Sequence, residues 1–170
     1  MGKLVEQVEH ADSWELSQIR EFVHDGPAIV VGTRSPTMHP HLCRGWAPTL
    51  SRDGRRLRMY VSTVQAELCL DDLRSCREVA MVCSRVRDYR TLQIKGVCVG
   101  FEGSEKTQDD LAKYWQRMVD GMCRVGLTPE QVNSFWASGL TELTIDVRDY
   151  FEQTPGPNAG TRIKLGPHAD

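Results

Sequence analysis

The chain has 170 residues, a formal net charge of -2 and 26% charged residues. A chain of this length fits one domain that buries most of its apolar surface without disulfides or metals. Because Lys and Arg are scattered and the chain is slightly acidic, the composition argues against proteins that bind nucleic acid or anionic lipid, and favours small-molecule or protein partners.

The six cysteines include no Cys-x-x-Cys pair and no Cys/His spacing suited to zinc. The sequence shows neither a charged-then-apolar leader nor an apolar stretch of membrane-spanning length, so we expect no secretion signal and no membrane span. We therefore interpret the cysteines as small buried hydrophobic residues of a cytoplasmic protein in a reducing compartment.

Four stretches have helical periodicity, and three of them begin at recognisable caps. Asp12 or Ser13 caps the first, Thr107 caps the third, and Thr128 begins a capping box with proline at the first helical position. The expected helices cover residues 12–24, 64–76, 107–125 and 128–136.

The remaining stretches alternate apolar and polar residues, or are apolar throughout, as strands are. Residues 28–33 form a continuous apolar run, so we expect a strand buried on both faces. The pair Asp53-Gly54 favours a hairpin, and Pro48 predicts an edge position or a bulge. Short links between consecutive strands predict an antiparallel sheet or barrel. The expected strands cover residues 28–33, 42–50, 57–62, 79–86, 89–101 and 143–151.

Two groups of polar residues are interpreted as exposed. In helix 64–76, which uses Leu68 as one apolar anchor, Asp71 and Asp72 are expected to face water. His39 and His41 lie in a predicted loop without a nearby carboxylate or cysteine pair, so we expect no metal site there.

The strand from residue 89 to residue 101 carries the most distinctive pattern. Leu92 and Ile94 point one way, and Gly96 predicts a bulge or a barrel corner. Periodicity alone indicates an ordinary amphipathic strand that meets solvent. The opposite face presents a polar row made of Thr91, Gln93 and Lys95.

The order of these elements, together with the segment Tyr-Arg-Thr-Leu-Gln-Ile-Lys-Gly at 89–96, resembles the pyridoxamine 5'-phosphate oxidase-like proteins with a flavin-binding split barrel. The resemblance covers residues 12–151 of a single domain, and 152–170 is expected to be an irregular tail. It implies a mainly β fold, a six-stranded antiparallel split β-barrel with peripheral helices. It also implies a homodimer with two FMN sites at the subunit interface.

In that family an arginine on the second strand and polar or basic residues after the third strand hold the phosphate, and a glutamine approaches the flavin ring. By position the arginine is Arg44, and Thr91 takes the place of the glutamine. Trp46 shares a face with Arg44, either offering its indole to a flat ring or simply stacking on the arginine. The cofactor-binding residues expected from the resemblance are Arg44, Trp46, Thr49, Ser62, Thr63, Gln65, Arg90, Thr91, Gln93 and Lys95.

The chain also departs from the oxidases. Thr49 stands where the oxidases have a lysine at the end of the second strand. Ala66-Glu67-Leu68 stands where they have a Ser-Arg-Lys sequence that binds the phosphate. The Glu67 carboxylate would therefore repel a phosphate unless its side chain faces away from it. The resemblance therefore implies an FMN-dependent oxidoreductase of unknown substrate other than a pyridoxine-converting oxidase. The alternative is a non-catalytic module of the same fold that holds haem, a deazaflavin or no cofactor. Some split-barrel relatives bind haem through a C-terminal histidine, which draws attention to His168, but we interpret His168 as part of a flexible tail end.

Overall fold

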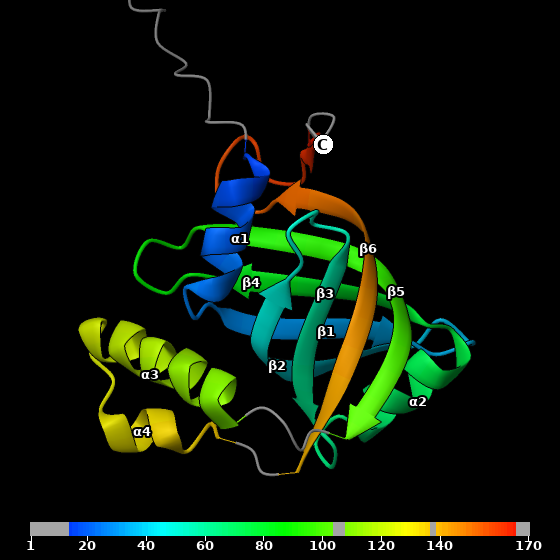
Figure 1. Ribbon diagram of the computed structural model, residues 1–170, viewed down its shortest axis with the longest axis horizontal. Helices are drawn as coiled ribbons and strands as arrows, with labels where there is room; N and C mark the ends of the chain where they lie inside the picture. The colour runs from blue at the N-terminus through cyan, green and yellow to red at the C-terminus, as the bar shows by residue number, and fades with distance from the viewer. Residues whose placement is uncertain (1–13, 104–107, 137–138, 166–170) are drawn as a thin grey trace, which may run out of the picture.

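The computed structural model describes residues 14–103, 108–136 and 139–165. Within them the chain forms seven strands and four helices (Figure 1). In chain order the elements are α1 (Leu16–His24), β1 (Ala28–Arg34), β2 (Pro40–Leu50), β3 (Arg56–Ser62), α2 (Glu67–Ser75), β4 (Glu78–Ser84), β5 (Thr91–Gly103), α3 (Gln108–Arg124), α4 (Pro129–Asn133), β6 (Leu140–Glu152) and β7 (Arg162–Ile163).

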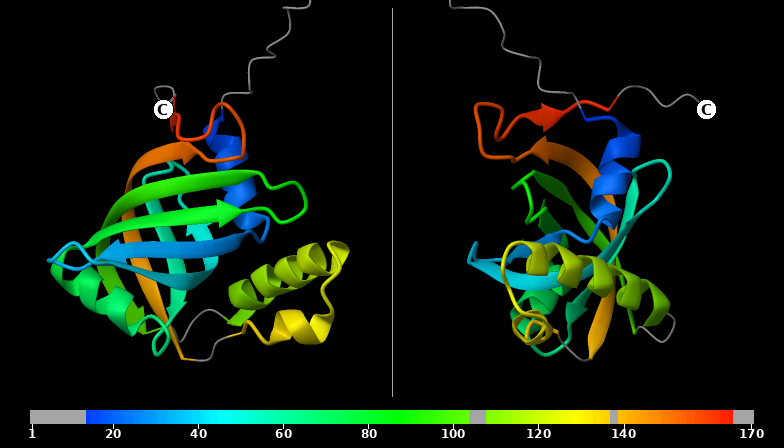
Figure 2. Two further views of the ribbon diagram at one scale, coloured as in Figure 1. Left: turned by 180° about the vertical axis from the view of Figure 1, so that it is seen from behind. Right: turned by 90° about the vertical axis from the view of Figure 1, so that its left-hand side faces the viewer.

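The strands form one antiparallel sheet in the order β3-β2-β1-β4-β5-β6-β7, and β3 also pairs with β6. This second pairing closes six strands into a barrel, which Figures 1 and 2 show from three sides. The predicted six-stranded antiparallel barrel is thus confirmed. The short strand β7, which pairs with Tyr150 and Phe151 of β6, was not predicted.

The barrel interior is filled by aliphatic and sulfur-containing side chains that alternate with outward-facing residues along each strand. Their near-complete burial makes the barrel a packed core without an internal channel. The interior side chains that are at most 2% exposed include Ile29, Val31, Leu57, Met59, Met81, Leu92, Ile94, Leu143 and Ile145.

The helices lie around the barrel. Helices α1 and α3 pack against β2, and α2 packs against β1 and β2. In Figure 1, α1 lies at the end of the barrel that carries the β2–β3 connection and the C-terminal segment, and α2 lies at the other end. No helix in the described parts of the chain is long and apolar enough to cross a membrane.

Two irregularities in the sheet occur where the sequence predicted them. The register between β5 and β6 shifts between Lys95 and Gly96, and a Cβ atom at Gly96 would overlap the carbonyl oxygen of Asp146. The register between β2 and β3 shifts between Trp46 and Thr49, on either side of Pro48. Both bulges are therefore confirmed.

The helix beginnings agree less well with the predictions. Helix α1 begins at Leu16, and Gln18 Oε1 accepts a hydrogen bond from the Glu15 backbone N–H at 2.9 Å. The predicted caps Asp12, Ser13 and Thr107 lie outside the described residues.

Two packing predictions are wrong. Strand β1 is not buried on both faces, because Val30 is 46% exposed on the outer face. Helix α2 begins at Glu67 instead of Val64, and Leu68 is 60% exposed instead of anchoring the helix. In both places an apolar side chain remains on the surface, which composition alone does not reveal.

Candidate functional site

The predicted polar row lies on the outer face of the sheet formed by β2, β1, β4 and β5. Arg44 is directly opposite Val30, Val30 is opposite Val82, and Val82 is opposite Gln93. Residues that are directly opposite in a sheet project to the same side. Arg44 and Gln93 therefore share the outer face, and Lys95 follows Gln93 on that face.

Arg44 is exposed and lies beside aromatic rings. Its guanidinium carbon is 5.0 Å from the centroid of the Phe135 ring and 5.9 Å from that of the Trp46 ring. Within the described parts of the chain it makes no ion pair with a carboxylate. It is thus a positive charge held in place by cation–π contacts and available to an anion.

Trp46 is packed beneath helix α3 and the segment that follows α4. Its ring centroid lies 5.9 Å from that of Trp115 and 6.3 Å from that of Trp136, and the residue is 1% exposed. Its Nε1 has no hydrogen-bond acceptor among the described residues. The observed role of Trp46 is core packing, so a ligand contact by its indole stays a prediction.

The residues expected to hold a phosphate follow the end of β3. Ser62 follows Val61, which pairs with Gly45, so the end of β3 lies near Arg44 in the sheet. The Ser62 side chain is buried and accepts a hydrogen bond from the Gln65 backbone N–H at 3.2 Å. Thr63 and Gln65 are exposed, and the Thr63 hydroxyl lies 2.9 Å from the Thr141 hydroxyl of β6, on the side of β3 away from β2.

Two of the predicted residues lie away from this group. Thr49 lines a hollow of about 280 Å³ next to Lys113 of α3, beyond the bulge in β2. The guanidinium carbon of Arg90 is 3.7 Å from the centroid of the Trp14 ring. Arg90 also lines a hollow of about 450 Å³ together with the loop 154–158.

The polar row on β5 is partly engaged within the chain. The Thr91 hydroxyl oxygen lies 3.1 Å from Ser84 Oγ and 2.9 Å from the Tyr89 carbonyl oxygen, so its single proton has an acceptor nearby. Gln153 Nε2 donates a long hydrogen bond of 3.5 Å to Gln93 Oε1. Thr91 is thus less available to a ligand than Gln93.

Lys95 lines a hollow of about 460 Å³ on the same outer face. The hollow exists because small residues, Gly32, Ala80 and Gly96, form part of its wall. Lys95 Nζ lies 4.7 Å from the centroid of the Phe151 ring. Together with Arg44 it places two cations on one face.

A buried polar cluster beneath α2 was missed by the sequence analysis. The Thr33 hydroxyl donates to Asp72 Oδ2 at 2.7 Å, and His41 Nδ1 lies 2.8 Å from the same oxygen. Asp72 is only 4% exposed, so the prediction that it faces water is wrong. The prediction that His41 has no nearby carboxylate is wrong as well.

The position of Asp72 in its helix is the signal for this burial. Asp72 follows Cys69 by three positions, so both side chains lie on the face of α2 that packs against the barrel. Burial tends to raise the pKa of Asp72, but the hydrogen bonds with His41 and Thr33 outweigh it and hold the pKa below its ordinary value. Asp72 is therefore a charged structural link.

No protein-family model and no curated protein matches the chain. Among solved structures, Group A Streptococcus HupZ gives a TM-score of 0.52 at 11% identity, over 85% of this chain and 98% of that one. An F420 reductase gives a TM-score of 0.51 at 16% identity, over 77% and 94%. A pyridoxamine 5'-phosphate oxidase-related, FMN-binding protein from Nostoc punctiforme gives 0.46 at 13%, over 84% and 86%. The first two matches demonstrate a shared fold.

Proposed function

The chain has the split-barrel fold, and from this premise we propose that it binds FMN or a closely related flavin on the outer face of β1, β2, β4 and β5. The observation that carries the proposal is Arg44, an exposed cation on that face without a carboxylate partner among the described residues. The polar side chains of Gln93 and Lys95 lie on the same face.

The phosphate end of the cofactor is assigned to Arg44. A guanidinium group presents two parallel N–H donors that match two phosphate oxygens, and such charge-assisted hydrogen bonds are stronger than neutral ones. Ser62, at the end of β3, and the exposed Thr63, whose hydroxyl also contacts that of Thr141, are assigned to the same phosphate as further hydroxyl ligands. These groups fit a phosphate.

The ring end of the cofactor is assigned to the polar row on β5. Gln93 and Lys95 provide hydrogen-bond donors beside the hollow of about 460 Å³, which is lined partly by small residues. A bound flavin would supply the redox chemistry, and the side chains of this chain would orient the ring and stabilise its charge. On this assignment the protein is an oxidoreductase whose substrate is a small molecule.

A second copy of the chain is proposed to cover this face. Val30 is 46% exposed and Leu42 is 72% exposed on neighbouring strands β1 and β2. Apolar side chains that lie together on a sheet face favour burial in an interface. We expect Leu42→Glu to convert a dimer into a monomer in analytical ultracentrifugation, because it buries a charge in the contact.

The control for this change is Tyr89→Glu, which replaces an exposed aromatic residue on the connection between β4 and β5, at the other end of the strands from Leu42. It is expected to leave the dimer intact. A monomeric wild-type protein, or a dimer broken by Tyr89→Glu but not by Leu42→Glu, contradicts the assigned interface.

The proposal is tested by comparing FMN with riboflavin, which has the same ring but no phosphate. Arg44→Gln is expected to weaken FMN binding by about tenfold to a hundredfold, since one charge-assisted contact is lost. The same variant should leave riboflavin affinity nearly unchanged. Absorbance and fluorescence titrations of the purified protein measure both affinities.

Two results would contradict the flavin site. The proposal as a whole is contradicted if purified wild-type protein gains no flavin absorbance when it is titrated with excess FMN. The assignment of Arg44 to the phosphate is contradicted if Arg44→Gln loses FMN affinity and riboflavin affinity equally while its melting temperature is unchanged.

A second candidate is a non-catalytic module that holds a deazaflavin, haem or no cofactor. Glu67 favours it, because this exposed carboxylate occupies the first turn of α2, where the oxidases are expected to have a basic phosphate grip. Binding of a deazaflavin without oxidation of reduced nicotinamide would favour this candidate. Rapid turnover of reduced nicotinamide with bound FMN would exclude it.

A further inference from the structure

A groove of about 1090 Å³ opens at the end of the barrel opposite Ser62 and Thr63. It forms along β6 because β3 pairs with β6 only as far as Asp146, whereas β7 begins to pair at Tyr150. Between these two pairings the Val147 backbone N–H donates to the Arg55 carbonyl oxygen, and among the described residues Arg148 and Asp149 have no strand partner on this side. The gap between the β2–β3 connection and β7 is large enough for a ligand of ordinary metabolite size.

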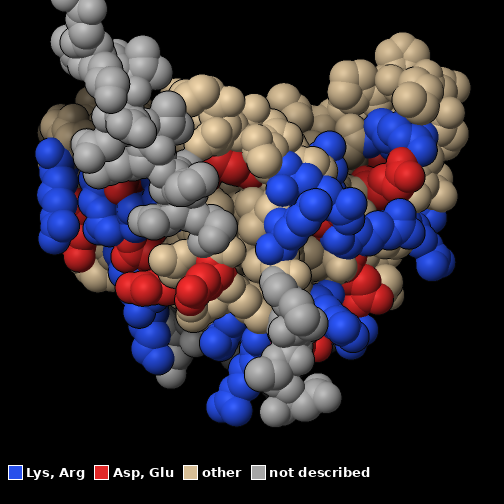
Figure 3. Space-filling model, turned by 90° about the horizontal axis from the view of Figure 1, so that it is seen from above, with Lys and Arg blue, Asp and Glu red and all other residues tan. Residues whose placement is uncertain are grey.

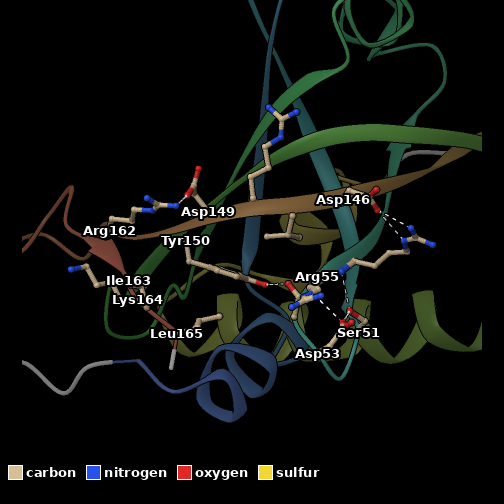
Figure 4. A pocket seen from close by; sticks show the side chains of 14 residues that line it. Ser51, Asp53, Arg55, Asp146, Asp149, Tyr150, Arg162, Ile163, Lys164 and Leu165 are labelled. Atoms are coloured by element: carbon tan, nitrogen blue, oxygen red, sulfur yellow. Dashed lines mark hydrogen bonds and ion pairs between the residues drawn. The ribbon is translucent and has the colours of Figure 1, made fainter. Parts of the chain in front are cut away.

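The base of the groove is held in place by Tyr150. Figure 4 shows its side chain reaching from β6 toward the β2–β3 connection, where its hydroxyl donates a hydrogen bond to the Gly54 carbonyl oxygen. Gly54 has φ of 69°, and a Cβ atom at this position would overlap Leu16 of α1. The connection therefore has one fixed position, which makes the groove a preformed feature.

The lining of the groove carries an excess of positive charge, although the whole chain has a formal net charge of -2. Figure 3 looks down on this end of the molecule and shows a broad basic region with acidic side chains among it. The lining contains five cations, Arg55, Arg56, Arg148, Arg162 and Lys164, and three carboxylates, Asp53, Asp146 and Asp149.

All three carboxylates are already engaged. Asp146 forms an ion pair with Arg56 at 2.9 Å, and Asp149 forms one with Arg162 (Figure 4). The pKa of Asp53 is held below its ordinary value by hydrogen bonds from the Ser51 hydroxyl and the Arg55 backbone N–H.

Three of the five cations have no ion-pair partner among the described residues, although the charge of Arg55 is partly offset by the Asp53 carboxylate, whose pKa it helps to lower. Arg55, Arg148 and Lys164 form no ion pair with any residue in the described parts of the chain. They come from the β2–β3 connection, from β6 and from the segment after β7, so they surround the groove. Cations fixed around a concave surface attract and orient an anion that carries several charges.

We propose that this groove is a second binding site, which takes a small molecule carrying a diphosphate or an equivalent pair of phosphate groups. Two guanidinium groups and one ammonium group suit phosphate oxygens, because the guanidinium groups bind in a forked manner and the ammonium acts as a point charge. The five cations of the lining exceed its three carboxylates by two charges, which a ligand with two or more negative charges offsets. The site adjoins the proposed flavin face, because Arg148 and Asp149 line both the groove and the hollow beside Lys95, and the rest of the groove lining belongs to the groove alone.

Calorimetric titration of the purified full-length protein with inorganic pyrophosphate at fixed ionic strength tests the proposal. We expect saturable binding of one pyrophosphate per chain. The double variant Arg55→Gln/Lys164→Gln should weaken it by about tenfold or more. These two residues are chosen because Arg148 also lines the hollow beside Lys95.

The matched control is Arg74→Gln/Lys113→Gln, which removes one arginine and one lysine charge from exposed positions on α2 and α3. It is expected to bind pyrophosphate as the wild type does. Equal weakening in both double variants would indicate attraction to overall charge only and would overturn the proposal. Absence of saturable binding to the wild type would overturn it as well.

Competition separates this site from the flavin site. Saturating FMN should leave pyrophosphate binding unchanged, and displacement of pyrophosphate by FMN would show that the groove belongs to the flavin and overturn a separate site. If the protein binds pyrophosphate but no flavin, the proposed flavin function is contradicted and the groove is supported as a phosphate-binding site. Tighter binding of a single-stranded oligonucleotide than of pyrophosphate would indicate a nucleic-acid site and overturn the proposed ligand class.

Discussion

His41 Nδ1 lies 2.8 Å from Oδ2 of Asp72, and this contact ties strand β2 to helix α2. Thr33 of β1 donates to the same oxygen, so one buried carboxylate holds three elements together. Asp72→Ala should lower the free energy of unfolding by about 2–3 kcal/mol, because two buried polar groups lose their partner. Urea unfolding measures the change.

The neighbouring residue offers a control for that experiment. Asp71 is exposed and pairs only with the exposed Arg74 on the surface of α2. Asp71→Ala is therefore expected to change the free energy of unfolding by no more than about 0.5 kcal/mol. Equal effects of the two substitutions would contradict a structural role for the buried link.

Asp72 should also shape the pH dependence of stability. Its pKa in the folded protein lies below the ordinary value of 3.8, because the hydrogen bonds with His41 and Thr33 outweigh the effect of burial. The unfolded chain therefore binds more protons near this pH. The stabilisation is present above about pH 4 and is lost as the pH falls through the lower folded pKa. Urea unfolding at several pH values should show this loss in the wild type and a shallower one in Asp72→Asn.

Gly96→Ala should destabilise the barrel by about 2 kcal/mol or more, because the added methyl group meets the backbone of Asp146 at the bulge. Gly100→Ala in the same strand is the control. The nearest atom to a Cβ there is Thr144 Cβ at 3.6 Å, an ordinary contact. Thermal unfolding compares the two variants, and a Gly96→Ala protein as stable as Gly100→Ala would contradict the observed register.

The double substitution Glu67→Arg/Leu68→Lys should strengthen FMN binding by about tenfold or more, because it removes a repelling carboxylate and adds two cations at the start of α2. Both positions are exposed, so the fold should tolerate the change. Riboflavin affinity should not rise. A gain for riboflavin as large as that for FMN would show that the effect does not come from the phosphate.

Cysteine reactivity offers a test of the core that is independent of any ligand. Cys83 is fully buried, and burial raises its pKa to about 12. At pH 8 it should not react with an aromatic disulfide reagent in the native protein and should react after unfolding in urea. Cys76 and Cys123 are half-buried and serve as internal controls, expected to react in the native protein. Mass analysis of the labelled peptides distinguishes the three.

Features that depend on neighbouring residues in the chain were predicted well. The turn at Asp53-Gly54, the bulge at Gly96 and the cap at Thr128, whose side chain accepts from the Gln131 N–H, all follow from local backbone requirements. The barrel itself follows from short connections between alternating strands. Its closure through β3 and β6 came from the family resemblance and not from periodicity.

Features that depend on distant residues were not predictable in this way. Asp72 is buried because β1 and β2 supply its partners, and Trp46 is packed against Trp115 of α3 and Trp136 after α4. Thr49 and Arg90 lie away from Arg44 because of a bulge and a contact with Trp14. None of these contacts has a signature within one stretch of sequence.

The closure of the barrel has a consequence for how the chain folds. Tyr60 of β3 donates a hydrogen bond to Glu142 of β6, although these residues are 82 positions apart in the sequence. Pairing over such a separation is slow, because a long loop must close before any contact compensates its entropy. During synthesis, β1 to β5 emerge from the ribosome before β6 does. The growing chain therefore exposes two unpaired strand edges until β6 arrives, and this is the stage at which it is most prone to aggregate.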